Sequence, residues 1–242
     1  DIPVIEFPAW DCLPYDRASP SAPVASARMA ALAFLAAHDG AAPVVVSTTV
    51  NAVTQRTPPK EVILASAFSA RPGAVVDMNA LVAYLAANGY ARASTVREPG
   101  EFAVRGGLID ILPPGASDPL RLDFFGDHLE TVRTFDPASQ LTMRQLAQVD
   151  LAAATEVLLT PETIARFRAG YVEAFGAALN DPLYEGVSAG RKQAGMEHWL
   201  PLFYERVDTL FDFVPRGLLV LYHLAAEAAD QRAELHRRLF VD

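Results

Sequence analysis

Residues 120–135 read LRLDFFGDHLETVRTF, a pattern typical of an antiparallel β-hairpin. Apolar residues occupy every second position from Leu120 to Phe124, so one face of the first strand is expected to be buried and the other largely solvated. Gly126-Asp127 predicts a two-residue turn with glycine at its first position, as a type II′ turn requires. We therefore predict strands at about 119–125 and 128–136.

The predicted register of this hairpin contains an unfavourable pair. A two-residue turn places Asp123 opposite Glu130, and like charges in direct opposition destabilise a sheet. Two explanations remain open: an arginine such as Arg133 bridges the two carboxylates, or the register differs from this simple count.

The surrounding residues extend the hairpin into a small domain. A further strand is predicted at about 101–112, and Asp77 is placed to cap a helix that stops at Gly89. Together these elements predict an antiparallel α+β domain over residues 59–142.

Residues 1–58 predict a different, α/β arrangement. A strand near 2–7 is followed by a helix over 24–37, for which Ser19-Pro20 is the expected start. The apolar run 43–47 is typical of a buried parallel strand. Residues 57–60, with two prolines, are expected to be a linker that closes a βαβ unit.

Residues 143–242 are expected to be helical and to return to the first sheet. Thr160-Pro161 begins a helix whose apolar positions, spaced three to four apart, continue to Ala178. The runs 210–214 and 218–221 are predicted as buried strands, and a last helix is predicted over about 222–240.

Composition excludes several classes of protein. The chain has 242 residues, 51% of them apolar, yet no apolar run is long enough to span a bilayer. A single cysteine, Cys12, excludes an internal disulfide framework and fits a reducing compartment. The net charge of −9 disfavours free-standing binding to nucleic acid. Because the chain opens directly on an apolar run without a methionine, we expect it to be a piece of a longer protein.

The search for catalytic chemistry yields one motif, which its context contradicts. Residues 186–190 match the G-x-S-x-G pattern around Ser188, and Asp212 and His223 follow in the order of a serine hydrolase. The motif needs a strand before it, whereas residues 180–185 read as a turn, so a flexible loop is the preferred interpretation. The sequence contains no P-loop and no metal-ligand spacing. We therefore predict no catalytic residue, cofactor or metal in this chain.

Three arginines of the middle domain are the candidate binding residues. Arg92, Arg97 and Arg105 fall close together, at a helix exit and on the first predicted strand. The planar guanidinium group suits bidentate pairing with carboxylates at protein interfaces. A solvated, partly ion-paired strand face is the alternative, and phosphate binding is a third possibility that neighbouring glutamates weaken.

Several longer blocks resemble a known family. These are FPAWDCLPYD at 7–16, GEFAVRGGLIDILP at 100–113, RLDFFGD at 121–127, TFDPASQ at 134–140 and GMEHWLPLF at 195–203. They resemble the UvrB-homology module at the N-terminus of the bacterial transcription-repair coupling factors, and the resemblance runs nearly end to end. It implies a partial RecA-like α/β unit in residues 1–58, an inserted domain in 59–142, and a helical continuation of the first unit in 143–242.

The resemblance also implies a role. Such a module is non-catalytic and recruits the excision-repair protein UvrA by mimicking UvrB through the inserted domain. The UvrA-contacting arginines of that family fall on Arg92 and Arg105, a third falls on Ala103 and is absent, and Arg97 and Phe102 are added by proximity. The alternative is a DNA- or nucleotide-binding part of a UvrB-like helicase.

Further expectations concern the longer protein that the resemblance implies. ATP and Mg²⁺ would act in its motor domains, other parts would contact RNA polymerase and duplex DNA, and a later domain would mask the UvrA surface. The resemblance places such a protein in the cytoplasm, with no membrane partner.

Overall fold

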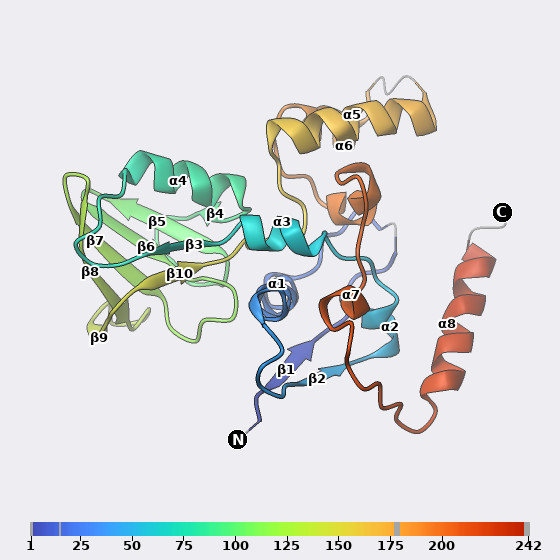
Figure 1. Ribbon diagram of the computed structural model, residues 1–242. Helices are drawn as coiled ribbons and strands as arrows, with labels where there is room; N and C mark the ends of the chain where they lie inside the picture. Colours follow the sequence, from blue (N-terminus) through green and yellow to red (C-terminus); the bar gives the residue numbers. More distant parts are fainter. Residues whose placement is uncertain (1, 15, 177–179, 240–242) are drawn as a thin grey trace.

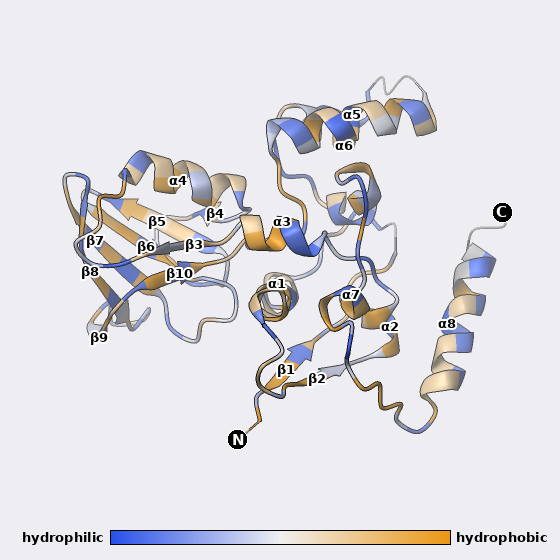
Figure 2. Ribbon diagram, viewed as in Figure 1, coloured by the Kyte–Doolittle hydropathy of each residue, from blue (hydrophilic) through white to orange (hydrophobic). Residues whose placement is uncertain are grey.

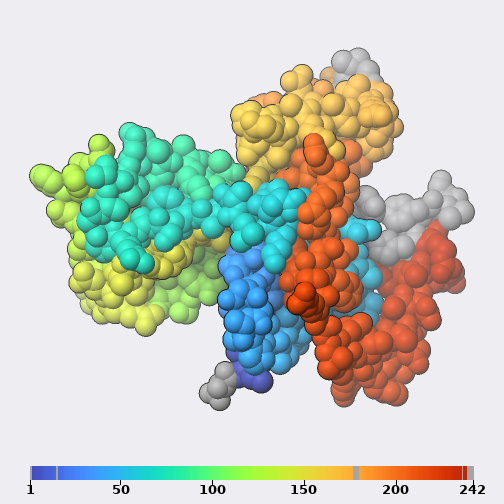
Figure 3. Space-filling model, viewed as in Figure 1, coloured from blue at the N-terminus to red at the C-terminus, as the bar shows by residue number. Residues whose placement is uncertain are grey.

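The computed structural model describes residues 2–14, 16–176 and 180–239 (Figure 1). The chain is a mixed α/β protein with both parallel and antiparallel sheets. The middle of the chain forms one lobe, and α3 (Lys60–Ala65) leads into it from the first unit (Figures 1 and 3). Among the described helices, none combines the length and apolar character needed to cross a bilayer.

The first unit contains the predicted strand–helix–strand arrangement. Strands β1 (Val4–Phe7) and β2 (Val45–Thr48) pair in parallel, with α1 (Ala22–Ala37) between them in the chain. The helix begins at Ala22, earlier than the predicted span, and its N-cap is Ser21 instead of Ser19. The predicted burial of the second strand is wrong: β2 is largely exposed, since the described part of this sheet contains only two strands.

The predicted linker at residues 57–60 is also wrong. Thr57 is buried, and its backbone exchanges two hydrogen bonds of 2.9 Å each with Asp208. The segment thus joins α2 (Val50–Val53) and α3 to the chain before α7 (Leu210–Phe213).

A six-stranded sheet in the order β4-β5-β6-β7-β8-β9 forms the middle lobe. Its strands are antiparallel except for the parallel pair β4–β5. Their bounds are β4 Ala91–Arg92, β5 Glu101–Arg105, β6 Leu108–Ile111, β7 Leu120–Phe125, β8 His128–Phe135 and β9 Thr142–Leu146.

One face of this sheet, the inner face, carries the core of the lobe. Ile109, Leu122 and Val132 lie side by side on it, and α4 (Met78–Ala87) packs against them through Leu81 and Leu85. Asp77 caps α4 as predicted, because its carboxylate accepts the first free backbone amides of the helix. In Figure 2, orange and blue are mixed along α4 and the strands of this lobe, as expected for elements with one buried and one solvated face.

The predicted strand at 101–112 is two strands. Gly106-Gly107 turns the chain back on itself between β5 and β6, and Gly106 has a φ of +58°, which glycine adopts without strain. In the sequence, this pair of glycines is the local pattern that indicates a hairpin turn between two strands.

The register explanation for the Asp123–Glu130 conflict is confirmed, whereas in the described structure Arg133 pairs with Asp123 alone and does not bridge the two carboxylates. A bulge after Asp123 shifts the register, so that Asp123 lies opposite Thr131 instead of Glu130. Arg133 Nη2 donates to Asp123 Oδ2 at 2.6 Å.

The chain does not turn helical at residue 143. After β9, β10 (Val149–Leu151) pairs with β3 (Phe68–Ala70) in a small antiparallel sheet. Helix α5 (Pro161–Phe175) then begins at the predicted cap, Thr160; Ala178 lies outside the described residues.

Two predicted strands near the end are absent from the described structure. Residues 210–213 form helix α7, and the run 218–221 is exposed coil, with Leu218 91% exposed. Between α5 and α7 lie α6 (Pro182–Ser188) and the 3₁₀ helix η1 (Met196–Leu202), and the last helix is α8 (Ala225–Leu239).

A buried ion pair ties the first unit to the chain that leaves the middle lobe. The guanidinium of Arg28, on α1, binds Glu156 at 2.6 Å and 3.2 Å. It also donates to the carbonyl of Pro8 and to the side chain of Gln55. Trp10 Nε1 donates to the same glutamate at 2.9 Å.

Candidate partner-binding surface

Strand β4 places Arg92 at one edge of the six-stranded sheet. Arg92 lies opposite Phe102 in the parallel β4–β5 pair, so the two side chains leave the sheet on the same, inner, face. Arg92 is exposed. Within the described part of the chain, no acidic side chain lies within 4.0 Å of it.

Arg97 belongs to the loop that joins β4 to β5. Val96 of this loop is buried against Ala103 and Leu112, which places the loop over the other, outer, face of the sheet. The backbone amides of Arg97 and Glu98 donate to the Glu101 carboxylate, so the loop has a fixed shape. The side chain of Arg97 is exposed.

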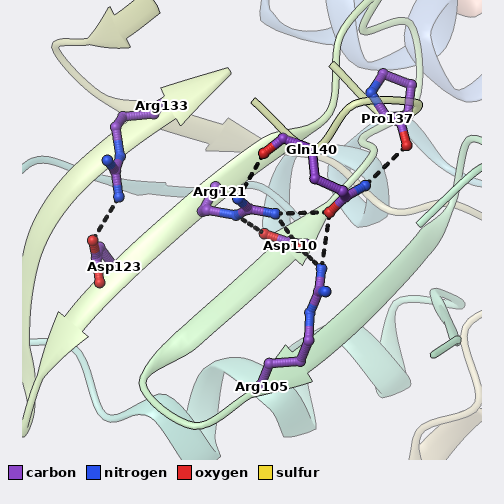
Figure 4. A network of polar contacts seen from close by, with 7 residues as sticks. All are labelled: Arg105, Asp110, Arg121, Asp123, Arg133, Pro137 and Gln140. Atoms are coloured by element: carbon purple, nitrogen blue, oxygen red, sulfur yellow. Dashed lines mark hydrogen bonds and ion pairs between the residues drawn. The ribbon is translucent and has the colours of Figure 1, made fainter. Parts of the chain in front are cut away.

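Arg105 ends β5 on the outer face and enters a polar network (Figure 4). Its Nη2 donates to Asp110 Oδ2 at 2.5 Å and to Gln140 Oε1 at 3.2 Å. Arg121, one strand beyond Asp110, donates to both carboxylate oxygens, at 2.7 Å and 2.9 Å. Asp110 is only 1% exposed. The two arginines therefore compensate the negative charge of a buried carboxylate.

Arg121 is the more deeply held of the two arginines. Its hydrogen bonds to Asp110 raise its pKa, against the effect of burial, and its guanidinium lies 4.3 Å from the centre of the Phe135 ring. Its Nη2 also donates to Gln140 Oε1 at 3.0 Å. Arg121 therefore acts as the anchor of the network, whereas the side chain of Arg105 remains 45% exposed.

The structure removes one residue from the predicted set and adds three. Phe102 is 2% exposed and packs in the core of the lobe, so its ring cannot contact a partner in this conformation. Asp110, Arg121 and Gln140 were missed. A lone aspartate inside the apolar strand 108–111 was the available signal, because a buried carboxylate requires cationic partners.

The structure therefore divides the predicted arginines between two faces. Arg92 lies on the inner-face side of the edge, whereas Arg97 and Arg105 lie on the outer side. Arg105 stands three residues beyond the partner of Arg92, about 10 Å along the strand. A partner that binds all three has to extend around the β4 edge.

The G-x-S-x-G motif does not form a catalytic site. Residues 182–188 are helical instead of a flexible loop, and Ser188 Oγ is buried without a hydrogen-bond partner in the described structure. Asp212 caps α7 through Thr209, and His223 is exposed. Among the described residues, no group of three His, Cys, Asp or Glu side chains is placed to hold a metal ion.

We expect a fluorophosphonate probe to leave Ser188 unlabelled, because a serine without an adjacent base is a poor nucleophile. Intact-mass analysis after incubation measures this, with a known serine hydrolase as the positive control. Labelling that disappears in Ser188→Ala would contradict the expectation.

Comparison with known proteins shows that this surface lies in a region that matches a known domain family. Residues 68–157 match the family model described as the UvrB interaction domain. This range holds all six strands of the sheet, the three predicted arginines and the Asp110 network. The resemblance to the transcription-repair coupling factors is confirmed. The matched range starts and ends later than the predicted middle domain.

Similarity to transcription-repair coupling factors extends over most of the chain. The chain is 35% identical to that of Haemophilus influenzae over 215 residues, which is 88% of this chain and 18% of the relative. It is 38% identical to that of Myxococcus xanthus over 218 residues, covering 87% and 18%. For Escherichia coli the identity is 34% over 221 residues, covering 90% and 19%. The chain thus spans about a fifth of the length of the coupling factors it matches.

Proposed function

We propose that this chain is a non-catalytic recruitment module that docks the excision-repair protein UvrA through its UvrB interaction domain. The observation that supports this most directly is the coincidence of the matched range with an exposed sheet edge that carries three arginines. In this proposal the module attracts UvrA by presenting the surface that UvrB would present.

The charges at the edge favour an acidic partner. Arg92 and Arg97 are exposed, and in the described structure neither has an acidic side chain within 4.0 Å. The net charge of the chain is −9, which disfavours binding to a phosphate backbone as a whole. Carboxylates on a protein partner can pair locally with these arginines without approaching the acidic remainder of the chain.

The proposal extends to the longer protein. We infer that residues 1–58 are part of a RecA-like unit that the middle domain interrupts, and that the chain continues into a protein whose motor domains use ATP and Mg²⁺. Other parts of that protein would contact RNA polymerase and DNA, and a later domain would cover the UvrA surface until it is needed. Such a protein would work in the cytoplasm.

Binding to purified UvrA tests the docking role. We expect Arg92→Glu to weaken binding by at least about 30-fold, since arginines at the centre of an interface contribute about 2 kcal/mol or more. Arg105→Gln should have a similar effect. Glutamate is avoided at position 105, because it would place a second carboxylate beside the buried Asp110. Isothermal titration calorimetry gives the affinities, and circular dichroism checks the fold.

A matched control lies on α8. Arg237→Glu changes the charge by the same amount on an exposed helix outside the matched range, and we expect it to leave UvrA binding unchanged. Failure of the unaltered, folded chain to bind UvrA would contradict the proposal. Salt-sensitive binding to duplex DNA instead would favour the helicase-like alternative.

A further inference from the structure

Among the described residues, Arg105 finds hydrogen-bond acceptors for one of its three side-chain nitrogens. Nη2 donates to both Asp110 and Gln140, and in the described structure no hydrogen bond leaves Nε or Nη1. Nη2 belongs to both guanidinium edges that bind a carboxylate through two parallel hydrogen bonds, so Nε and Nη1 are left as separate donors of single hydrogen bonds. Because the side chain is 45% exposed, these donors are open to a partner.

Asp110 holds Arg105 without neutralising the network. The carboxylate already accepts two hydrogen bonds from Arg121, so one negative charge faces two positive charges. The excess positive charge lies on the more exposed arginine, Arg105. A second carboxylate, supplied from outside, would complete the balance.

Gln140 fixes the network from the opposite side (Figure 4). Its Oε1 accepts from both arginines, and its Nε2 donates to the Pro137 carbonyl at 2.9 Å. The residue has a φ of +62°, an uncommon conformation for a side chain of this size. Strain of this kind persists where surrounding contacts impose it and often accompanies a functional site.

We propose that Asp110 and Gln140 are positioning residues that hold Nη2 of Arg105, so that its exposed guanidinium donates a single hydrogen bond, from Nη1 or Nε, to a carboxylate of the docking partner. This inference rests on the proposed function, because it assigns the chemistry of the group that meets Arg105. The side chain of Arg105 is then already ordered before the partner binds. Binding is therefore tighter, because it does not include the entropy cost of ordering a long arginine.

A double-mutant cycle with UvrA separates positioning from general structure. In Gln140→Gly, glycine accepts the positive φ, so we expect the fold to be kept while the amide contact disappears. Binding should weaken about 10-fold, the effect of a lost hydrogen bond to a charged group. In the Arg105→Gln background, the same change should cost nothing, because the group that it positions is gone.

Asp110→Asn gives a second measurement. We expect it to weaken binding by at least about 10-fold in the unaltered background and to have little effect beside Arg105→Gln. Should this variant fail to fold, the Gln140→Gly cycle still decides the question. Each variant is checked by circular dichroism before titration.

The outcomes distinguish the two proposals. An equal loss from Gln140→Gly in both backgrounds, or no loss in either, would overturn the positioning role while leaving UvrA docking intact. If the unaltered chain does not bind UvrA, the proposed function is overturned and the positioning role falls with it. Loss confined to the background that contains Arg105 would support both.

Discussion

Replacement of Arg28 by methionine will lower the free energy of unfolding by about 3–5 kcal/mol, the cost of leaving one partner of a buried ion pair alone. Methionine keeps most of the side-chain length, so the loss reports the charge and its hydrogen bonds more than packing. The arginine is fully buried, and its removal leaves the Glu156 carboxylate, which is 4% exposed, without a cation. Trp10 also loses a well-ordered acceptor, because its Nε1 donates to that carboxylate.

Urea unfolding followed by tryptophan fluorescence measures this effect, since Trp10 reports directly on the Arg28–Glu156 pair. Arg237→Met is the matched control: its ion pair with Glu234 is exposed, and exposed pairs contribute less than about 1 kcal/mol. A loss for Arg28→Met no larger than for this control would show that the pair does not hold the first unit to residue 156.

The parts of the fold that were predicted correctly depend on local patterns. The hairpin at 120–135 follows from alternation and a glycine turn, and α4 and α5 follow from their capping residues Asp77 and Thr160. In contrast, the runs 210–214 and 218–221 were predicted as strands. A short apolar run fits a buried strand or a buried helical turn equally well, and only tertiary contacts distinguish them.

The candidate surface was predicted only in part, because sequence proximity identifies some of its residues and tertiary contacts determine the others. Arg92, Arg97 and Arg105 are close in sequence, and the structure places all three at one sheet edge. Their separation onto two faces depends on the β4–β5 register, which no local pattern specifies. Gln140 reaches Arg105 across 35 positions of the chain, so its role could not be read from spacing. Phe102 does not belong to the surface, because strand alternation turns its ring into the core of the lobe.

Substitution of Gly89 by alanine will destabilise the middle lobe by about 3 kcal/mol. Gly89 follows α4 with a φ of +83°, a conformation that costs an alanine about 1 kcal/mol. A Cβ there would also lie 2.2 Å from Thr155 Cγ2 and 2.7 Å from Thr155 Cβ. Thr155 is buried, so the clash can be relieved only by moving backbone, at a further cost of about 1–3 kcal/mol.

Gly73→Ala isolates the steric part of this effect. Gly73 has a φ of +89°, but a Cβ there meets nothing within 4 Å, so its cost should stay near the conformational value of about 1 kcal/mol. Thermal and urea unfolding of both variants gives the difference in the free energy of unfolding.

Thr155→Ser removes the Cγ2 methyl and should restore part of the stability of Gly89→Ala. Equal losses for the two glycine variants would show that the chain after β10 does not press on the end of α4. A larger loss at Gly89 would show that Thr155 packs tightly against the end of α4, directly before β4, the strand that carries Arg92.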